Sequence, residues 1–373
     1  MCLSGLALPG GSCGGELVPR HQTAWVIRMR WKWGRWEHGP MSVRSAGSSR
    51  PGSEDLSRLA ELASEAGNQV ARQHVVSQVL LRQFATPVRH ASGLQVQPYD
   101  LLYPERHCRT KPTRAVGWIK DFVPYASASL EALWAEVEQK LPPVFHAVPQ
   151  GTALGDPHAL AVLRDLIALH YVRSQHYRDT FHRIFKEAHA EQRRWLLAEG
   201  QQLLRAATLQ RTGLDTPGRQ ALAVRADELL STMVESYGNG SLLRVRIEDS
   251  FRTAREWVAG VGLEILQAEE GEFLIGDNPA MTLRTEDEQL IYGMALGDAH
   301  TAVLPLGPRH TLALGAADGA GSVPRAWVDR MNVLQVKTAR RRVFTRPGSP
   351  LRRFIGQLIP QWQADQSATR LSP

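Results

Sequence analysis

The sequence has few cysteines and no long apolar run. Its three cysteines are Cys2, Cys13 and Cys108, and no two of them form a Cys-x-x-Cys pair. A disulfide framework and a zinc ribbon are therefore excluded, and a reducing cytoplasm is the compartment that we expect. No apolar run approaches the roughly 18 residues that a membrane-spanning helix needs, so we predict no membrane span.

The short motifs of common enzyme classes are missing as well. The chain has no phosphate-binding P-loop, no Gly-x-Ser-x-Gly elbow, no His-Glu-x-x-His, no EF-hand loop and no Gly-x-Gly-x-x-Gly. This argues against P-loop nucleotide hydrolysis, common serine hydrolases, zincin proteases and Rossmann redox chemistry. The sequence identifies no cofactor. His176, His182 and His189 follow at spacings of six and seven, which are poor for a metal site on one helix, and His182, Lys186 and His189 fit a solvated face, so we predict no metal site.

What the chain does have is the composition of an ordinary globular protein. It is 373 residues long, 43% apolar and 22% charged, which is enough to bury a large core. The net charge of +7 is a weak basic excess. It is compatible with an anionic or nucleic-acid ligand and does not by itself define a DNA-binding protein.

The composition along the chain predicts three segments. Residues 1–52 form a disordered or wrongly assigned leader, with Met41 as an alternative start, because a Gly/Ser/Arg stretch follows Met41. Residues 53–345 form a single domain, helical over 53–240 and mixed α/β over 241–345. Residues 346–373 form a flexible basic tail. We therefore expect an α+β fold, predominantly helical in its N-terminal and central part, with a C-terminal antiparallel sheet.

Hydrophobic periodicity and start and stop signals predict the individual elements. The expected helices cover 53–66, 73–84, 129–141, 157 to about 205 in two pieces or one kinked piece, 217–238, 250–258 and 324–340. The expected strands cover 93–103, 242–247, a hairpin of 262–266 with 272–275, a pair of 300–305 with 310–314, and 343–345.

The stretch from Gln73 to Phe84 is the most informative part of the sequence. As a helix it places His74, Gln78 and Arg82 on one face at i, i+4 and i+8, beside an apolar stripe. An imidazole can move protons near pH 7, and a guanidinium can hold a carboxylate or phosphate.

This stretch resembles the opening signature of a bacterial family, the domain of unknown function numbered 4238. Members read Asn-His-His-aromatic-Val-Pro-Gln, then a few apolar residues, then Leu-Arg-Asn-Phe. Gln73 stands in place of the first histidine and Ser77 in place of the proline. The matching residues are His74, Val76, Gln78, Leu81, Arg82 and Phe84.

A second candidate lies at the end of the apolar segment 273–275. The family has Ser or Thr, Asp, any residue and Pro here, which Asp277 and Pro279 match, while Gly276 departs from the pattern. Strand ends deliver side chains into clefts, so Asp277 is a candidate base or metal ligand, with Asn278 beside it. The alternative is a turn in which Asp277 accepts backbone N–H groups.

A third candidate is the set Asp165, His170, Arg173 and Tyr177 on the predicted long helix. The resemblance implies an arginine near this point, which Arg173 matches.

A basic loop follows the first predicted strand and could guide a phosphate-bearing partner or lie in solvent. It contains Arg106, His107, Arg109, Lys111, Arg114 and Lys120. The resemblance also implies a structural asparagine, matched by Asn332.

These residues support three hypotheses. The first is an intracellular hydrolase-like enzyme acting on a phosphate-bearing or nucleic-acid substrate, with His74 and Asp277 catalytic, Arg82 and Arg173 as anion clamps, and Gln78 and Asn278 contacting substrate. The second is a non-catalytic module that binds a ligand or a protein. The third is a buried hydrogen-bond network of His74, Gln78 and Asp277 that ties helix to sheet.

Overall fold

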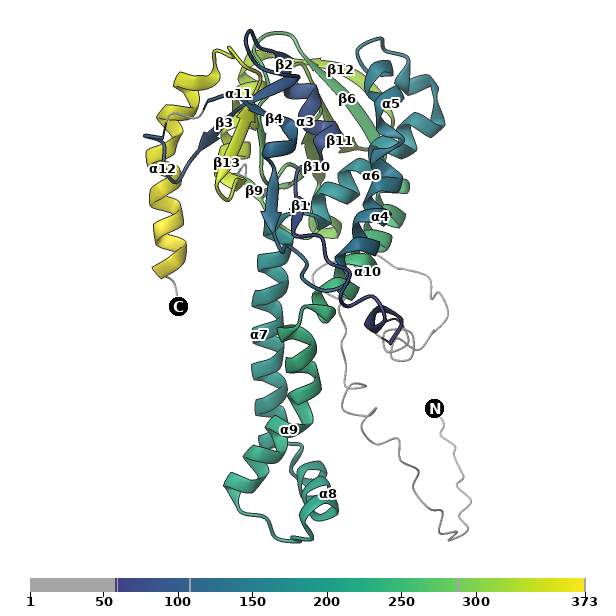
Figure 1. Ribbon diagram of the computed structural model, residues 1–373, viewed down its shortest axis with the longest axis vertical. Helices are drawn as coiled ribbons and strands as arrows, with labels where there is room; N and C mark the ends of the chain where they lie inside the picture. The colour runs from purple at the N-terminus through teal and green to yellow at the C-terminus, as the bar shows by residue number, and fades with distance from the viewer. Residues whose placement is uncertain (1–57, 59, 107–108, 287–288, 372–373) are drawn as a thin grey trace, which may run out of the picture. The chain divides into compact units, whose positions relative to one another are not determined.

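The computed structural model describes residues 58, 60–106, 109–286 and 289–371 (Figure 1). The expected leader, residues 1–52, lies outside these residues. Residue contacts divide the chain into two compact units. The described part of the first unit is Arg193–Thr232, and the second unit holds the described residues up to Gln192 and from Met233 onward. The boundaries between the two units lie at residues 192/193 and 232/233, inside two long helices of the region expected as one domain over 53–345.

Helices and strands alternate in blocks along the described chain. The α-helices are α3 (Gln78–Leu81), α4 (Ser127–Glu138), α5 (Leu141–Ala147), α6 (Pro157–Val172), α7 (Gln175–Ala198), α8 (Gln201–Thr212), α9 (Arg219–Gly238), α10 (Ser241–Ala259), α11 (Arg325–Thr338) and α12 (Leu351–Leu371). The strands are β1 (Arg72–His74), β2 (Thr86–Pro87), β3 (Leu94–Asp100), β4 (Lys111–Pro112), β5 (Trp118–Lys120), β6 (Gly262–Ala268), β7 (Ile275–Gly276), β8 (Met281–Glu286), β9 (Gln289–Tyr292), β10 (Thr301–Pro305), β11 (His310–Gly315), β12 (Gly319–Val323) and β13 (Arg342–Thr345). The fold is α+β, as the sequence predicts.

The largest sheet has the strand order β12-β6-β11-β10-β8-β9 and is buried on both faces. Along β10, Ala302 and Leu304 pack with the helical core, while Val303 between them packs with α11 on the other face. This follows from the twofold alternation of a strand. The predicted pairing of 300–305 with 310–314 is confirmed as β10 and β11. One pair, β12 with β6, is parallel, so the sheet is mixed.

A second sheet joins strands from the N-terminal and C-terminal parts of the described chain. β13 pairs antiparallel with β3 on one side and with β7 on the other. Successive residues of β13 alternate: Phe344 belongs to the helical core, and Val343 to a separate apolar cluster. Strand β3 confirms the predicted strand over 93–103, and β13 confirms the one over 343–345.

The expected flexible tail from residue 346 is wrong. Helix α12 covers most of it and lies beside β3 and β13 in Figure 1. Leu351, Ile355, Ile359 and Trp362 are buried at spacings of three and four, which is one face of a helix. The basic composition of this segment belongs to its opposite, exposed face, which explains why composition alone suggested a frayed end.

Local signals fix several helix boundaries. Asp156 begins α6 as predicted: its Oδ1 accepts the backbone N–H of His158 at 2.9 Å, and Pro157 follows as the first helical residue. The chain then breaks at Arg173–Ser174, because the Ser174 hydroxyl accepts the N–H of Tyr177 at 3.0 Å and so begins α7. The helix does not continue to about 205, as one kinked piece would.

Two predicted elements between 240 and 276 are wrong. Residues 242–247 are the first turns of α10, not a strand, because Leu243, Ile247 and Phe251 place one buried face at helical spacing. The hairpin of 262–266 with 272–275 does not form. Both edges of β6 are taken by β11 and β12, so Ile275 pairs with β13 instead.

Side-chain amides of α11 hold the segment that the hairpin would have contained. Asn332 accepts the N–H of Leu274 at 2.9 Å and donates to the carbonyl of Glu272 at 2.8 Å, so it is a structural residue that holds the segment before β7. Gln335 accepts the N–H of Gly276 at 2.7 Å. A Cβ at Gly276 would lie 3.0 Å from the Gln335 carbonyl, so glycine suits this contact.

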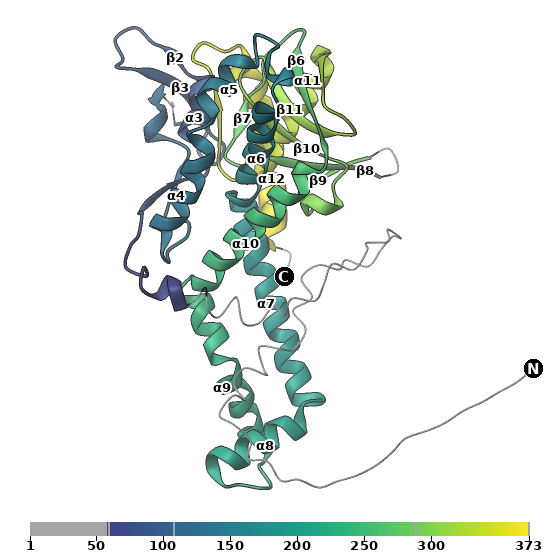
Figure 2. The same cartoon turned by 90° about the vertical axis from the view of Figure 1, so that its right-hand side faces the viewer.

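The first unit is a small helical assembly built from the end of α7, α8 and most of α9. Its buried apolar side chains are Leu196, Leu204, Leu222, Ala226 and Leu230. Arg193 forms an ion pair with Asp227 at 2.6 Å, which links α7 to α9 where the two helices run side by side (Figure 2). Among the helices that the structure describes, none is long and apolar enough to cross a membrane.

The packing of α12 predicts a measurable contribution to stability. Replacing Ile355 by Ala removes a fully buried side chain, and we expect the free energy of unfolding to fall by about 2–4 kcal/mol in urea titrations. Gln357→Ala, on the exposed face of the same helix, should change it by less than about 0.5 kcal/mol. Equal effects of the two substitutions would show that α12 is not part of the folded core.

Candidate functional site

The signature stretch folds differently from the predicted helix over 73–84. Residues Arg72–His74 form strand β1, which pairs antiparallel with β5, and helix begins only at Gln78. Two side chains enforce this. The Gln73 amide accepts the N–H of Val123 at 2.6 Å and donates to its carbonyl at 2.9 Å, as a strand partner would. The Ser77 hydroxyl accepts the N–H of Leu80 at 3.2 Å and begins α3.

The turn between β1 and α3 is closed against Gly117. The Gly117 carbonyl accepts the N–H groups of Val75 at 2.8 Å and Val76 at 3.1 Å. Gly117 has a φ of +73°, and a Cβ on it would lie 2.8 Å from Leu81 and 3.2 Å from the Val76 carbonyl. Glycine is required here for both reasons, so the position of His74 depends on a close backbone contact.

His74 therefore sits on a strand and not on a helix face with Gln78 and Arg82. Its side chain is half-buried, and its Nε2 is buried with no hydrogen-bond partner among the described residues. Burial lowers the pKa of His74 to about 4, with the positive charge of Arg173 acting in the same direction and a hydrogen bond to the Arg114 backbone opposing both. The imidazole is neutral at pH 7 and able to accept a proton.

Arg173 is the centre of the polar cluster beside His74. It directly follows α6, and its side chain is 2% exposed. Its guanidinium donates to Glu138 at 2.6 Å and to Glu131 at 3.1 Å, and it lies over the ring of Trp134 at 4.3 Å. These three partners come from successive turns of α4. The buried charge is thus compensated by two carboxylates and an aromatic face.

Four polar atoms of this cluster are buried without a hydrogen-bond partner among the described residues. They are His74 Nε2, Glu131 Oε1, Trp134 Nε1 and Arg173 Nε. Buried polar groups are nearly always paired, and clustered exceptions mark sites that handle polar molecules. Burial raises the pKa of the Glu131 carboxyl, against the opposing effect of Arg173. The cluster therefore holds a carboxyl whose pKa burial raises and an imidazole whose pKa burial lowers.

His170 has a structural place behind the cluster. It is fully buried, its Nε2 accepts the N–H of Ser77 at 3.2 Å, and its Nδ1 donates to the Leu166 carbonyl at 3.0 Å. Burial lowers the pKa of His170 to about 3. It connects α6 to the signature turn and so helps to hold His74 in place.

Asp165 and Tyr177, the other two residues of the third candidate site, bond to different partners away from Arg173. Asp165 forms a two-bond ion pair with Arg255 at 2.8 and 2.7 Å, and the Tyr177 hydroxyl bonds to Ser250 at 2.6 Å. His170, Arg173 and Tyr177 do not lie on one long helix as predicted, because α6 ends at Val172 and α7 begins only at Gln175.

Gln78 and Arg82 are also separate from His74. Gln78 is the half-buried first residue of α3, and Arg82 is exposed at the end of that short helix. Within the described part of the chain, no hydrogen bond links either of them to the Arg173 cluster. The signature does not place the predicted polar trio on a single surface.

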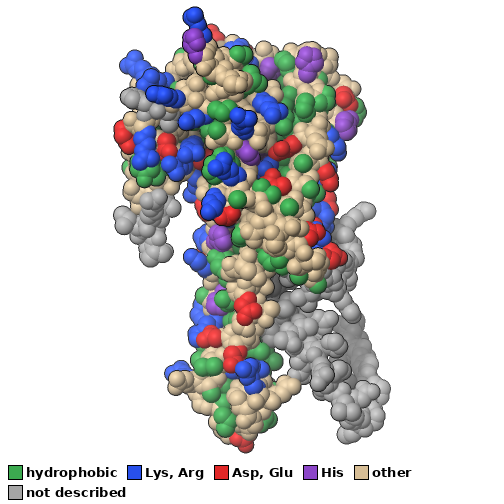
Figure 3. Space-filling view, viewed as in Figure 1, with side chains coloured by type: hydrophobic (Ala, Val, Ile, Leu, Met, Phe, Trp, Pro, Cys, Tyr) green, Lys and Arg blue, Asp and Glu red, His purple; other side chains and the backbone are tan. Residues whose placement is uncertain are grey.

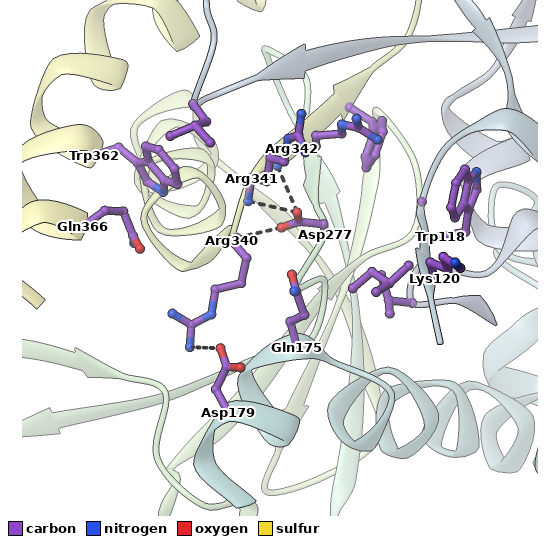
Figure 4. Close-up of a pocket in the computed structure, with 15 residues that line it drawn as sticks. Trp118, Lys120, Gln175, Asp179, Asp277, Arg340, Arg341, Arg342, Trp362 and Gln366 are labelled. Carbon is purple, nitrogen blue, oxygen red and sulfur yellow. Dashed lines mark hydrogen bonds and ion pairs between the residues drawn. The ribbon is translucent and has the colours of Figure 1, made fainter. Parts of the chain in front are cut away.

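Asp277 anchors a different segment. Its carboxylate accepts three backbone N–H groups, from Arg340 at 2.7 Å, Arg341 at 3.0 Å and Arg342 at 2.9 Å. Figure 4 shows these bonds meeting at Asp277 in the middle of the drawn residues. Burial raises the pKa of Asp277, and the three donors oppose this by stabilising the charged form. Asp277 thus accepts backbone N–H groups, as the turn alternative predicted. The donors are not in a local turn, because they lie more than sixty residues away in the sequence.

Asp277 lines a cavity of about 650 Å³ whose lining residues do not include His74. The structure does not bring His74 and Asp277 together around this hollow, as the first hypothesis requires. Strand β1 and its turn take part in both places, since His74 lies beside Arg173 and Val75 lines the cavity. Asn278 is buried, and its Oδ1 has no partner among the described residues.

Sequence reasoning missed Glu131, Trp134 and Glu138. Their signal is present in the spacing of three and four along α4, which places two carboxylates and an indole on one helix face. This spacing indicates a site only if a buried cation lies beside α4, and nothing in the sequence places Arg173 there. The run Arg340-Arg341-Arg342 is visible in the sequence and was missed as a cavity wall.

The three histidines of the long-helix region, for which we predict no metal site, have separate partners. His176 bonds to the Gly293 carbonyl at 2.9 Å, His182 bonds to the Tyr237 hydroxyl at 2.9 Å, and His189 stacks on Phe185. Across the described ranges, no three His, Cys, Asp or Glu residues meet in a way that could hold a metal ion.

Comparison with known proteins gives the class to which this fold and site belong. The family model described as "Protein of unknown function (DUF4238)" matches residues 72–349, from β1 to the turn after β13. The chain belongs to this family, as the signature predicts. No curated protein and no solved structure matches it. The matched range includes the Arg173 cluster and Asp277 with its three backbone donors at residues 340–342.

The lowered pKa values of His74 and His170 predict acid sensitivity. Above pH 6.5 both imidazoles are neutral in the folded and unfolded chain. Below it the unfolded chain binds protons that the folded chain does not, so the free energy of unfolding falls as pH drops from 6.5 toward 4. Each histidine contributes at most about 1.4 kcal/mol per pH unit.

Urea titrations between pH 7 and pH 4.5 measure this slope. His74→Asn should reduce the slope, because one of the two histidines is removed. His158→Asn, at an exposed position at the start of α6, should leave it unchanged. A slope that is the same in all three proteins would contradict the assigned protonation of His74.

Proposed function

We propose that this protein is a cytoplasmic bacterial hydrolase-like enzyme that acts on a phosphate-bearing or nucleic-acid substrate at the Arg173 cluster. The observation that carries the proposal is the opposed pKa shifts of Glu131 and His74, which both interact with the buried cation of Arg173 and each hold a polar atom without a partner among the described residues. Paired groups whose environments favour opposite protonation states are the usual equipment of acid–base catalysis.

In this proposal His74 is the general base. Its Nε2 takes a proton from a water molecule as the water oxygen attacks the substrate, and the leaving oxygen takes the proton that Glu131 holds. Proton exchange with solvent then restores both groups. Arg173 does not clamp the substrate, because its two terminal nitrogens are bound to Glu138 and Glu131. It is a positioning residue for both catalytic groups.

Glu131 replaces Asp277 as the acidic partner of His74. Both carboxylate oxygens of Asp277 accept backbone N–H groups, which leaves them poorly placed to exchange protons with a substrate. The weak basic excess of the chain, with a net charge of +7, supports a phosphate-bearing substrate. Three cysteines without a Cys-x-x-Cys pair support the cytoplasmic location.

The second candidate is a non-catalytic module that binds an anionic ligand or a protein. The arginine-lined cavity favours it, because binding there needs no proton transfer. It predicts saturable binding without turnover. The third hypothesis, a buried hydrogen-bond network of His74, Gln78 and Asp277, is wrong, because Asp277 bonds to the backbone of residues 340–342 and His74 Nε2 has no partner among the described residues.

Kinetics of two conservative variants test the enzyme proposal. With phosphate monoester, phosphate diester and single-stranded RNA substrates, His74→Gln and Glu131→Gln should each lower kcat/KM by at least about 100-fold. The reason is that neither amide can exchange the required proton. The activity of the unmodified protein should persist to pH near 4 and fall at higher pH as Glu131 loses its proton.

Thermal melts and a matched control make the test decisive. His158→Asn replaces an exposed histidine and should retain full activity. Loss of activity in the two site variants with melting temperatures close to that of the unmodified protein supports catalysis. Unfolding of both variants, or no turnover of any of the three substrate classes by the unmodified protein, would reject it.

A further inference from the structure

Three consecutive arginines form one wall of the 650 Å³ cavity. Their backbone is fixed by the three hydrogen bonds to Asp277 and by the bond from the Asp277 N–H to the Arg342 carbonyl at 2.9 Å. Arg342 is also the first residue of β13, which is paired on both edges. The cationic side chains therefore start from a rigid backbone, which lowers the entropic cost of ordering them around a ligand.

The three guanidinium groups differ in how far they are already engaged. Arg340 pairs with Asp179 at 2.9 Å, as Figure 4 shows, and its Nε is buried without a partner among the described residues. Arg341 pairs with Asp100 at 2.9 Å. Arg342 has only a long contact of 3.8 Å to the same carboxylate within the described chain. Arg342 is thus the arginine most available to a ligand.

Lys120 supplies a second available cation on the opposite wall. It is the last residue of β5, its side chain is 76% exposed, and its contact with Asp121 is long, at 3.9 Å. In Figure 4, Lys120 and Trp118 stand across the cavity from Trp362 and Gln366. Of the two carboxylates in the lining, Asp277 is engaged by backbone and Asp179 by Arg340. The remaining chemistry of the walls is therefore cationic and partly apolar.

The dimensions and lining point to a small ligand. A volume of about 650 Å³ is within the range of roughly 300–1,000 Å³ that small-molecule sites occupy. Val75, Leu102 and Ile119 give it apolar surface beside the cations, which suits a molecule with one charged end and one less polar end. Lys and Arg side chains also gather on the side of the surface that carries β3 and α12 (Figure 3), so anions are attracted toward this part of the molecule.

We propose that this cavity binds a small phosphate-bearing molecule of about nucleotide size, with Arg342 and Lys120 holding its phosphate groups. Arg340 remains paired with Asp179, and Gln175 and Gln366 add polar groups to the lining. The inference goes beyond the proposed function, because its residues differ from those of the Arg173 cluster. It holds whether or not His74 is catalytic.

Calorimetric titration of the full chain tests this with three probes of known charge. ADP and pyrophosphate should bind saturably, and uncharged adenosine should bind at least about 100-fold more weakly, because the phosphates supply the charge-assisted bonds. Arg342→Ala should weaken ADP binding about tenfold or more, and Lys120→Ala should weaken it in the same direction.

Arg330→Ala is the matched control. It removes the same charge from an exposed position on α11, outside the cavity, and should change ADP affinity by less than about twofold. The exposed Lys120 variant keeps the test valid if Arg342→Ala is unstable. Equal weakening by Arg330→Ala and Arg342→Ala would overturn the site, since it would mean non-specific charge attraction. Binding of a 20-nucleotide RNA without binding of ADP or pyrophosphate would overturn the small-ligand assignment.

The outcome is separable from that of the enzyme proposal. Titration reports binding without turnover, so a loss of ADP affinity in Arg342→Ala supports the cavity even where His74→Gln leaves every activity unchanged. Conversely, full ADP affinity in Arg342→Ala and Lys120→Ala rejects the cavity and leaves the kinetic test of His74 intact.

Discussion

The buried guanidinium of Arg173 is the constraint on which the functional argument depends. A cation that is 2% exposed cannot remain unpaired, because removing one partner of a buried ion pair costs about 3–5 kcal/mol. Glu131, Glu138 and the ring of Trp134 all come from α4, and Arg173 comes from the residue that follows α6. The cation therefore fixes the register of α4 against α6.

The same charge shapes the protonation of its neighbours. It acts with burial to lower the pKa of His74, and it acts against burial at Glu131, where burial has the larger effect. Burial beside this cation thus leaves the His74 imidazole neutral at pH 7 and the pKa of the Glu131 carboxyl raised. The β1–β5 pair, closed at Gly117, brings His74 to this place, and the neighbouring Val75 lines the arginine cavity. Both proposed sites therefore depend on the signature turn.

Much of the fold could be predicted because its signals are local. Asp156-Pro157 begins α6, and Pro324 precedes α11. The alternation of β10 and β11 marks a buried pair. The signature helix could not be predicted correctly, because its first residues are held as a strand by the Gln73 amide and Val123, fifty positions away. The same is true of residues 242–247 and of the tail, where tertiary packing selects a helix that composition and alternation did not favour.

The site was predicted in part for the same reason. His74 and Arg173 were found from residue chemistry and family resemblance, and the structure places them in one cluster. Asp277 was found too, but its three backbone partners are set by the path of the chain after α11. The most direct test of the account is an NMR titration of the His74 imidazole in the intact protein. The account predicts a pKa of about 4. A midpoint near the ordinary value of about 6.5 would contradict it, because His74 would then lie in solvent and away from Arg173.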